Sequence, residues 1–96
     1  MLAPTITVAI TVAAGTGTAT AKVDGWGEYI GLKSPDATPK YDFELLDEGG
    51  FIASQANRID AQIAKIADKF RCSGDCTFRI TGAADPGVYT VKLYML

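Results

Sequence analysis

Two stretches of this 96-residue chain, one near each end, alternate strictly between apolar and polar positions. From Thr5 to Val12, isoleucine and valine fill every second position and threonine or alanine fills the others. The run 88–96 has the same period, and its apolar set is Tyr89, Val91, Leu93 and Met95. A period of two is typical of a strand with one buried face, and outward threonine favours strand over helix. The pattern therefore predicts a strand at each end of the chain.

The segment 76–96 predicts a β-hairpin. Phe78 and Ile80 give its first run an apolar face, and Ala-Ala-Asp-Pro-Gly separates that run from the second. Pro86 fixes φ, and Gly87 can adopt the positive φ that a type II turn needs. Two alternating runs on either side of such a turn are expected to pair with each other.

Turn residues separate shorter alternating runs in the rest of the chain. Gly15-Thr16-Gly17 is expected to join the first strand to a second, and Asp24-Gly25 to turn the chain into a third, in which Trp26, Ile30 and Leu32 point inward. Tyr41, Phe43 and Leu45 give a fourth strand its inward face. These expected strands lie at 18–23, 26–33, 41–47 and 51–54.

The stretch 57–70 fits two patterns. Ile59, Ile63, Ile66 and Phe70 lie on one helical face, but the residues from Ile66 onward also alternate. We expect a strand over 69–72, preceded by a loop or short helix around 57–67. If Ser73-Gly74-Asp75 is a hairpin loop, Cys72 lies opposite Cys76 on the neighbouring strand.

Short strands at this spacing, each ended by a turn signal, are typical of a small antiparallel β-sandwich or jelly-roll. The sequence therefore predicts an all-β fold of about seven or eight short strands in a single domain, 1–96.

Composition narrows the range of functions. The net charge is −2 with no basic cluster, so we expect no nucleic-acid partner. No apolar run is long enough to span a membrane. The chain has no histidine, the commonest general base and a frequent zinc ligand. It also has no nucleophile motif and no phosphate-binding glycine loop. We therefore expect no enzyme activity, no catalytic or metal site and no cofactor.

Two groups of residues still offer chemistry. Cys72 and Cys76 could form a disulfide, remain a reduced pair or, without further ligands, contribute poorly to a metal site. Asp42 and Glu44 share the outer face of a strand. They are either part of a solvated surface or a pair of carboxylates that could act together in catalysis. The turn at 47–50 contains Asp47 and Glu48, whose carboxylates are of the kind that bind calcium.

Three residues suggest an interaction surface. Tyr29, Leu46 and Tyr94 are out of phase with the inward sets of their strands. If they are contiguous, they form an apolar patch suited to a protein partner or to stacking on sugars. Burial between two sheets is the alternative.

The strand pattern resembles two protein families. The run Tyr41–Ile52, together with Cys-Thr-Phe-Arg-Ile at 76–80 and Pro-Gly-Val-Tyr-Thr-Val-Lys-Leu at 86–93, is similar to small all-β virion proteins of tailed bacteriophages, as is the Thr/Ala/Gly-rich opening at 5–23. Those proteins decorate capsids or build head fibres and necks. The same pattern resembles, more weakly, the pre-peptidase C-terminal domain, a jelly-roll appended to secreted bacterial proteases. Because the chain starts at Met1, the sequence favours the phage family.

The phage resemblance implies a structural protein of the virion, assembled in the host cytoplasm. It would be a capsid decoration or cement protein that binds the major capsid protein or other virion proteins as a symmetric homo-oligomer. The alternative is a carbohydrate- or calcium-binding β-sandwich module of a secreted protein, for which exposed Trp26, Tyr29 or Tyr94 would provide the aromatic contacts.

Overall fold

The computed structural model describes residues 4–96, and every regular element among them is a β-strand. All seven strands are antiparallel members of one sheet. The all-β prediction is confirmed. The strands are β1 (Thr5–Val12), β2 (Gly17–Lys33), β3 (Tyr41–Leu46), β4 (Ile52–Ile59), β5 (Ile63–Ile66), β6 (Phe70–Thr81) and β7 (Gly87–Met95).

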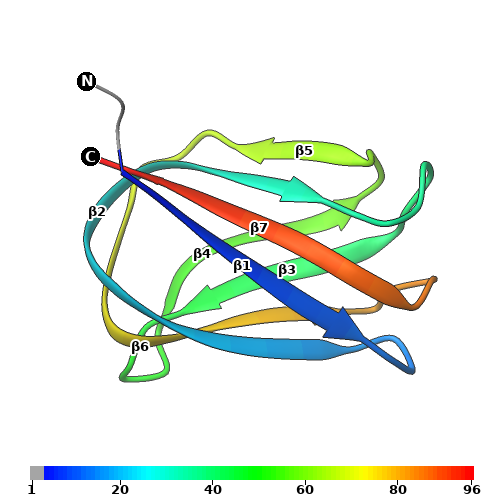
Figure 1. Cartoon of the computed structure of the whole chain (residues 1–96), viewed down its shortest axis with the longest axis horizontal. Coiled ribbons are helices and arrows are strands. Elements are labelled where there is room, and N and C mark those ends of the chain that lie inside the picture. The colour runs from blue at the N-terminus through cyan, green and yellow to red at the C-terminus, as the bar shows by residue number, and fades with distance from the viewer. Residues whose placement is uncertain (1–3) are drawn as a thin grey trace.

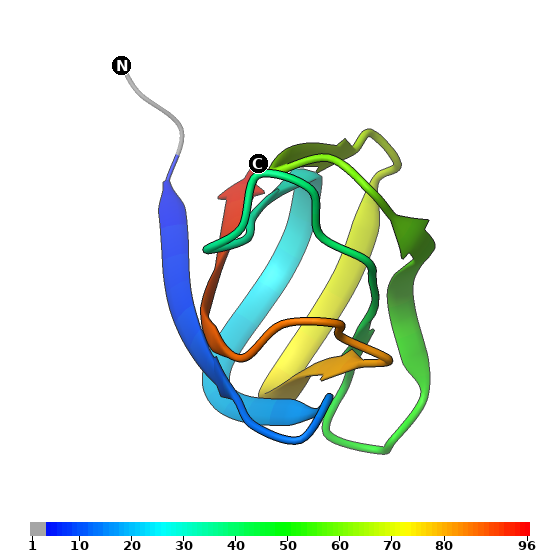
Figure 2. The same ribbon diagram turned by 90° about the vertical axis from the view of Figure 1, so that its right-hand side faces the viewer.

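The sheet folds onto itself to make a sandwich (Figures 1 and 2). Its strand order is β1-β7-β2-β6-β3-β4, and β5 pairs with the end of β2. The long strand β2 belongs to both layers, because its residues 27–33 pair with β7 and its residues 17–27 pair with β6. We call β1, β7, β5 and residues 27–33 of β2 the β7 layer. The β3 layer consists of β3, β4, β6 and the first half of β2.

Glycine allows β2 and β6 to bend together between the layers. Gly25 has a φ of 125° and Gly74 a φ of 85°, and the two strands stay paired from one to the other. The predicted turn at Asp24-Gly25 and the predicted hairpin loop at 73–75 are therefore both wrong. A positive φ is needed both at a bend in a continuous strand and at a reversal of the chain. A glycine in the sequence therefore does not distinguish the two.

The predicted C-terminal hairpin is also wrong. The strands β6 and β7 both form, but β2 lies between them in the sheet, and residues 82–86 carry the chain from one layer to the other. The first predicted turn forms in a shifted position: Ala13 and Thr16 exchange backbone hydrogen bonds around Ala14 and Gly15. The turn does not close a two-stranded hairpin, because the whole of β1 pairs with β7 and not with β2.

The core matches the alternation of the sequence. Inward side chains of both layers are almost fully buried, and Tyr41 of β3 meets Tyr89 of β7 edge to face, with ring centroids 4.9 Å apart. Trp26 is an exception, because it was expected to point inward and is 54% exposed. A bulge between Gly27 and Tyr29 changes the phase of β2 there. Among the predicted inward residues, the buried ones include Val8, Ile10, Val12, Ile30, Leu32, Tyr41, Phe43, Leu45, Phe78, Ile80, Tyr89, Val91, Leu93 and Met95.

The ambiguous stretch 57–67 contains strand and loop, so the short helix allowed there does not form. Strand β4 continues to Ile59, and β5 follows at Ile63–Ile66. Ile59 and Ile66 are buried, whereas Ile63 is 73% exposed. Arg58 has a φ of 55° beside an irregular part of the β3–β4 ladder, which disturbs the simple alternation of this stretch.

No helix long and apolar enough to cross a membrane is found in residues 4–96.

Candidate ligand-binding face of the β7 layer

Two of the three residues predicted to form an interaction surface lie together. Tyr29 of β2 and Tyr94 of β7 are cross-strand partners on the outer face of the β7 layer. Their rings are stacked, with centroids 4.1 Å apart and planes inclined by 18°. Leu46 lies apart from them, on the β3 layer, where it pairs with Thr77 and Ile52. The predicted patch of three therefore becomes a tyrosine pair and a separate leucine.

Two lysines extend the tyrosine pair into a row. The Nζ of Lys65 lies 4.2 Å from the ring centroid of Tyr29, and the Nζ of Lys92 lies 5.2 Å from that of Tyr94. A ring separation of 4.1 Å leaves no room for an ammonium group between the rings. Each lysine therefore covers an outer ring face, and we call Lys65, Tyr29, Tyr94 and Lys92 the tyrosine row.

The tyrosine row presents hydrogen-bond donors to solvent. Burial, the neighbouring Tyr94 and the charge of Glu28 raise the pKa of Tyr29 above its ordinary value, so its hydroxyl remains protonated at neutral pH. An ammonium group offers three donors and no acceptor. The row is therefore suited to a ligand that carries acceptor or anionic oxygens.

A hollow lies beside the row because one position in the sheet is glycine. Gly31 pairs with Lys92 of β7 on one side and with Lys65 of β5 on the other. The space above it is about 200 Å³, and its walls include Lys33, Ile63 and Tyr94. A Cβ at Gly31 would lie 3.5 Å from Cε1 of Tyr94, an ordinary contact. The hollow is therefore a missing side chain on a flat sheet, and a larger residue could fill it.

Three lysines gather on this face, and one carboxylate, that of Glu28, is near enough to act on Tyr29. Lys33, Lys65 and Lys92 come from three adjacent strands, and their cross-strand partners are uncharged. Within residues 4–96, no carboxylate lies within ion-pair distance of any of the three. On the β3 layer, by contrast, Arg79 pairs with Glu44 at 3.3 Å.

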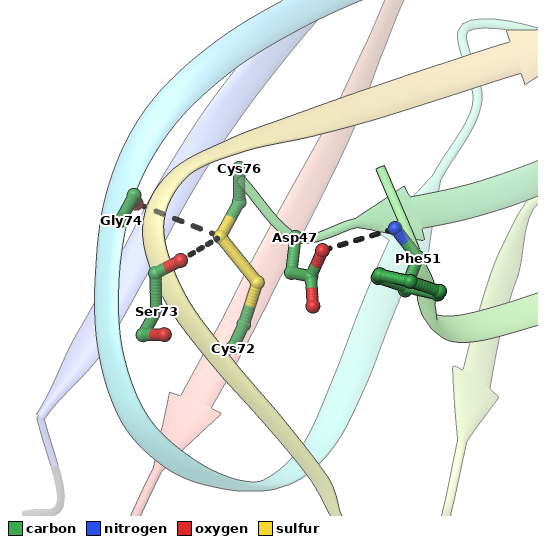
Figure 3. Close-up of a disulfide and its surroundings, with 6 residues drawn as sticks. All are labelled: Asp47, Phe51, Cys72, Ser73, Gly74 and Cys76. Atoms are coloured by element: carbon green, nitrogen blue, oxygen red, sulfur yellow. Dashed lines mark hydrogen bonds between the residues drawn. A yellow bond between two sulfur atoms is a disulfide. The ribbon is translucent and has the colours of Figure 1, made fainter. Parts of the chain in front are cut away.

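Three of the four acidic residues singled out in the sequence have hydrogen-bond or ion-pair partners within the chain. Glu44 is engaged by Arg79, and Oδ1 of Asp42 accepts a hydrogen bond of 2.7 Å from the backbone N–H of Arg58. Oδ1 of Asp47 accepts from the N–H of Phe51 and closes the β3–β4 turn (Figure 3). The part of the chain that the structure describes holds no group of three or more metal-ligating side chains.

Cys72 and Cys76 form a disulfide (Figure 3). The two cysteines lie on the same strand, on either side of the bend in β6, and not opposite each other in a hairpin as the sequence predicted. Their Cα atoms are 7.0 Å apart, much closer than the roughly 13 Å that four residues span in a straight strand. Both are buried, so the bridge holds the bend at which the sheet changes layers.

Sequence reasoning missed the lysines and the glycine of this face. Lys92 shares the outward alternation of Tyr94, two positions away, so that pair could have been found from the pattern. Lys65 and Gly31 become neighbours only through the pairing of β2 with β5, which no local signal encodes.

The fold is similar to that of a pre-peptidase C-terminal domain. A crystal structure of this domain from a collagenase of Bacillus anthracis aligns over 99% of this chain and 90% of its own length, with a TM-score of 0.56 and 15% sequence identity. The likeness shows a shared β-sandwich fold. No protein-family model and no curated protein matches the sequence. The weaker of the two resemblances thus has structural support, while the phage resemblance stays a prediction from sequence.

Proposed function

We propose that this chain is a non-catalytic binding module of a secreted protein, and that it binds carbohydrate on the outer face of the β7 layer. The observation that carries the proposal is the tyrosine row beside the hollow over Gly31. It places two aromatic residues, two cations and a depression of about 200 Å³ on one exposed sheet.

Two further features support a secreted module. The similar β-sandwich is a pre-peptidase C-terminal domain of a collagenase, and such domains are appended to secreted proteases. Disulfides persist mainly in oxidising compartments outside the cytosol, and Cys72 and Cys76 form one here.

Trp26 offers a second aromatic contact. Its indole is 54% exposed at the boundary between the two layers, where the backbone carbonyl of Trp26 accepts a hydrogen bond from the N–H of Leu96, two residues beyond Tyr94. The faces of Tyr29 and Tyr94 are covered by each other and by lysine, so these two rings offer their edges and hydroxyl groups. Stacking on a sugar needs an open ring face, which makes Trp26 the better candidate for that contact.

Binding to a polysaccharide panel tests the proposal. The panel should contain neutral polymers (cellulose, xylan and mannan) and acidic ones (polygalacturonate, alginate, hyaluronan and heparin), measured by affinity electrophoresis and calorimetry. We expect at least one to bind and Tyr94→Ala to weaken it by about tenfold or more. The matched control is Phe51→Ala, which removes an aromatic side chain that is 75% exposed next to β4. The proposal fails if no polymer binds, or if Phe51→Ala and not Tyr94→Ala reduces binding.

A further inference from the structure

We infer that the carbohydrate is an acidic polysaccharide, bound through its carboxylate or sulfate groups by Lys33, Lys65 and Lys92, with one sugar residue in the hollow over Gly31. This inference rests on the proposed function and specifies the ligand class for the same face. Its first support is the distribution of charge. The chain as a whole carries a net charge of −2, yet three adjacent strands each place one lysine on this face. The cluster is therefore local and does not follow from a basic composition.

The second support is that two of these cations are held in position. The negative face of an aromatic ring attracts a lysine ammonium group, and the Nζ of Lys65 lies 4.2 Å from the Tyr29 centroid. Lys92 is held less closely over Tyr94, at 5.2 Å. Side chains that are ordered before binding lose less entropy when the ligand arrives. The tyrosine row thus keeps its ammonium groups apart and facing solvent.

The third support is that the face favours an anionic sugar over a neutral one. The inner faces of Tyr29 and Tyr94 cover each other and their outer faces carry ammonium groups, so these rings have no free face for a sugar ring. What remains is a set of ammonium and hydroxyl donors. Charge-assisted hydrogen bonds from such donors to carboxylate or sulfate are roughly twice as strong as those to neutral hydroxyls.

The fourth support is the spacing of the strands. Adjacent strands lie about 4.8 Å apart, a distance comparable to the length of one sugar residue in an extended polysaccharide. Lys65, Gly31 and Lys92 share one register, so a chain that crosses β5, β2 and β7 there would meet a lysine on each of the two flanking strands. The hollow over Gly31, whose walls include Lys33 and Lys92, would receive the sugar residue between them.

The same features disfavour a nucleic acid, the other common polyanion. Proteins that bind single strands stack successive bases on open aromatic faces; the tyrosine row offers none, which leaves Trp26 as a single stacking contact. No arginine lies at the positions of β5, β2 and β7 that form this face. Single-stranded DNA therefore belongs in the test as a competing polyanion.

The test compares ligands that differ only in charge. Polygalacturonate and its fully methyl-esterified form share one backbone, so calorimetry with both isolates the carboxylate. We expect the acid form to bind about tenfold more tightly or better, with an affinity that falls as salt rises. Alginate, hyaluronan, heparin and single-stranded DNA are measured alongside, so that the result does not depend on one backbone.

Three variants locate the site. Lys65→Gln with Lys92→Gln should reduce affinity for the acidic polymer by about tenfold or more, and Gly31→Thr should reduce it by filling the hollow. The control is Lys22→Gln, which removes an exposed lysine from the β3 layer. Circular dichroism and melting temperature verify that each variant is folded.

Each outcome decides between the two proposals. If neutral and esterified polymers bind as well as acidic ones, and Tyr94→Ala weakens them, the proposed function stands and the acidic ligand class is wrong. If none of the polysaccharides binds, both fail. Equal binding of single-stranded DNA, or an equal loss in Lys22→Gln, would overturn the assignment of an acidic polysaccharide to this face.

Discussion

The two outer faces of the sandwich are built from the same kind of alternating strand but differ in the partners of their charged side chains. On the β3 layer, Glu44 pairs with Arg79 and Asp42 accepts a backbone hydrogen bond from Arg58. On the β7 layer, Lys33, Lys65 and Lys92 have no carboxylate partner among residues 4–96. On the first face, the Glu44 and Asp42 carboxylates are engaged by groups of the same chain. On the second face, three lysines from adjacent strands gather around the tyrosine pair and the hollow, and this arrangement is the reason for placing the ligand there.

The strand β2 runs through both layers, and its glycines provide the largest expected contrast. A Cβ at Gly17, in the β3 layer, would overlap the carbonyl oxygen of Thr11, whereas one at Gly31 has room. Gly17→Ala should lower the free energy of unfolding by about 3 kcal/mol, as overpacking does. Gly31→Ala should leave it unchanged or raise it by about 0.5 kcal/mol, because alanine restricts the unfolded chain. Urea denaturation measures both, and equal losses would contradict the description of the hollow.

Reduction of the disulfide tests whether ligand binding on the β7 layer depends on the bridge at the bend of β6. The bridge between Cys72 and Cys76 closes a loop with a sequence separation of only 4. By chain entropy such a loop contributes about 2 kcal/mol to stability. Reductant should therefore lower the melting temperature, while ligand binding at a temperature where the protein remains folded should persist. Loss of binding by the folded, reduced protein would show that the bend controls the β7 layer.

Tyr41 of the β3 layer and Tyr89 of the β7 layer contact each other in the core, and their hydroxyl groups differ in hydrogen bonding. The hydroxyl of Tyr89 donates to the carbonyl of Asp85 at 2.8 Å, whereas the buried hydroxyl of Tyr41 has no hydrogen-bond partner. Tyr89→Phe should cost about 1 kcal/mol of unfolding free energy. Tyr41→Phe should be neutral or stabilising, because it removes an unsatisfied group. Thermal melts of the two variants at neutral pH measure the difference, and the opposite order would contradict it.

Alkaline pH should separate these tyrosines further. Burial, assisted by the nearby Tyr89, raises the pKa of Tyr41 from 10.0 to about 12. A group whose pKa is raised on folding contributes stability that is fully present below its unfolded pKa and is lost as pH rises through its folded pKa. The stability of the protein should therefore fall between pH 10 and about 12. Tyr41→Phe should reduce this fall, which urea titrations at several pH values can measure. An unchanged slope would show that other groups cause it.

The smallest expected effect compares one charge from each face. Glu44→Gln removes the partly exposed ion pair with Arg79 and should cost about 0.5 kcal/mol. Lys92→Gln removes the cation over Tyr94 and should cost a similar amount. Only Lys92→Gln should reduce binding of the acidic polymer. The comparison between the faces fails if Glu44→Gln weakens binding as much.

The sequence predicted the sidedness of the strands well and their pairing poorly. The alternation in 5–12 and 88–96 identified β1 and β7 and their buried residues, because a half-buried strand imposes that pattern locally. The bends at Gly25 and Gly74 were interpreted as reversals, since the glycine signal is the same for both. Without the pairing of β2 with β7, Tyr29 and Tyr94 could be identified as outward but not as neighbours. Leu46 was outward as well, yet it belongs to the other layer.

Chemical-shift mapping by ¹⁵N NMR tests the central claim most directly. Oligogalacturonate titrated into the labelled protein is expected to shift the amide resonances of Tyr29, Gly31, Lys65 and Lys92, and to leave those of Thr18, Glu44 and Arg79 on the opposite face unchanged. Shifts confined to the β3 layer, or none at all at saturating ligand, would contradict the assignment of the β7 layer as the binding face.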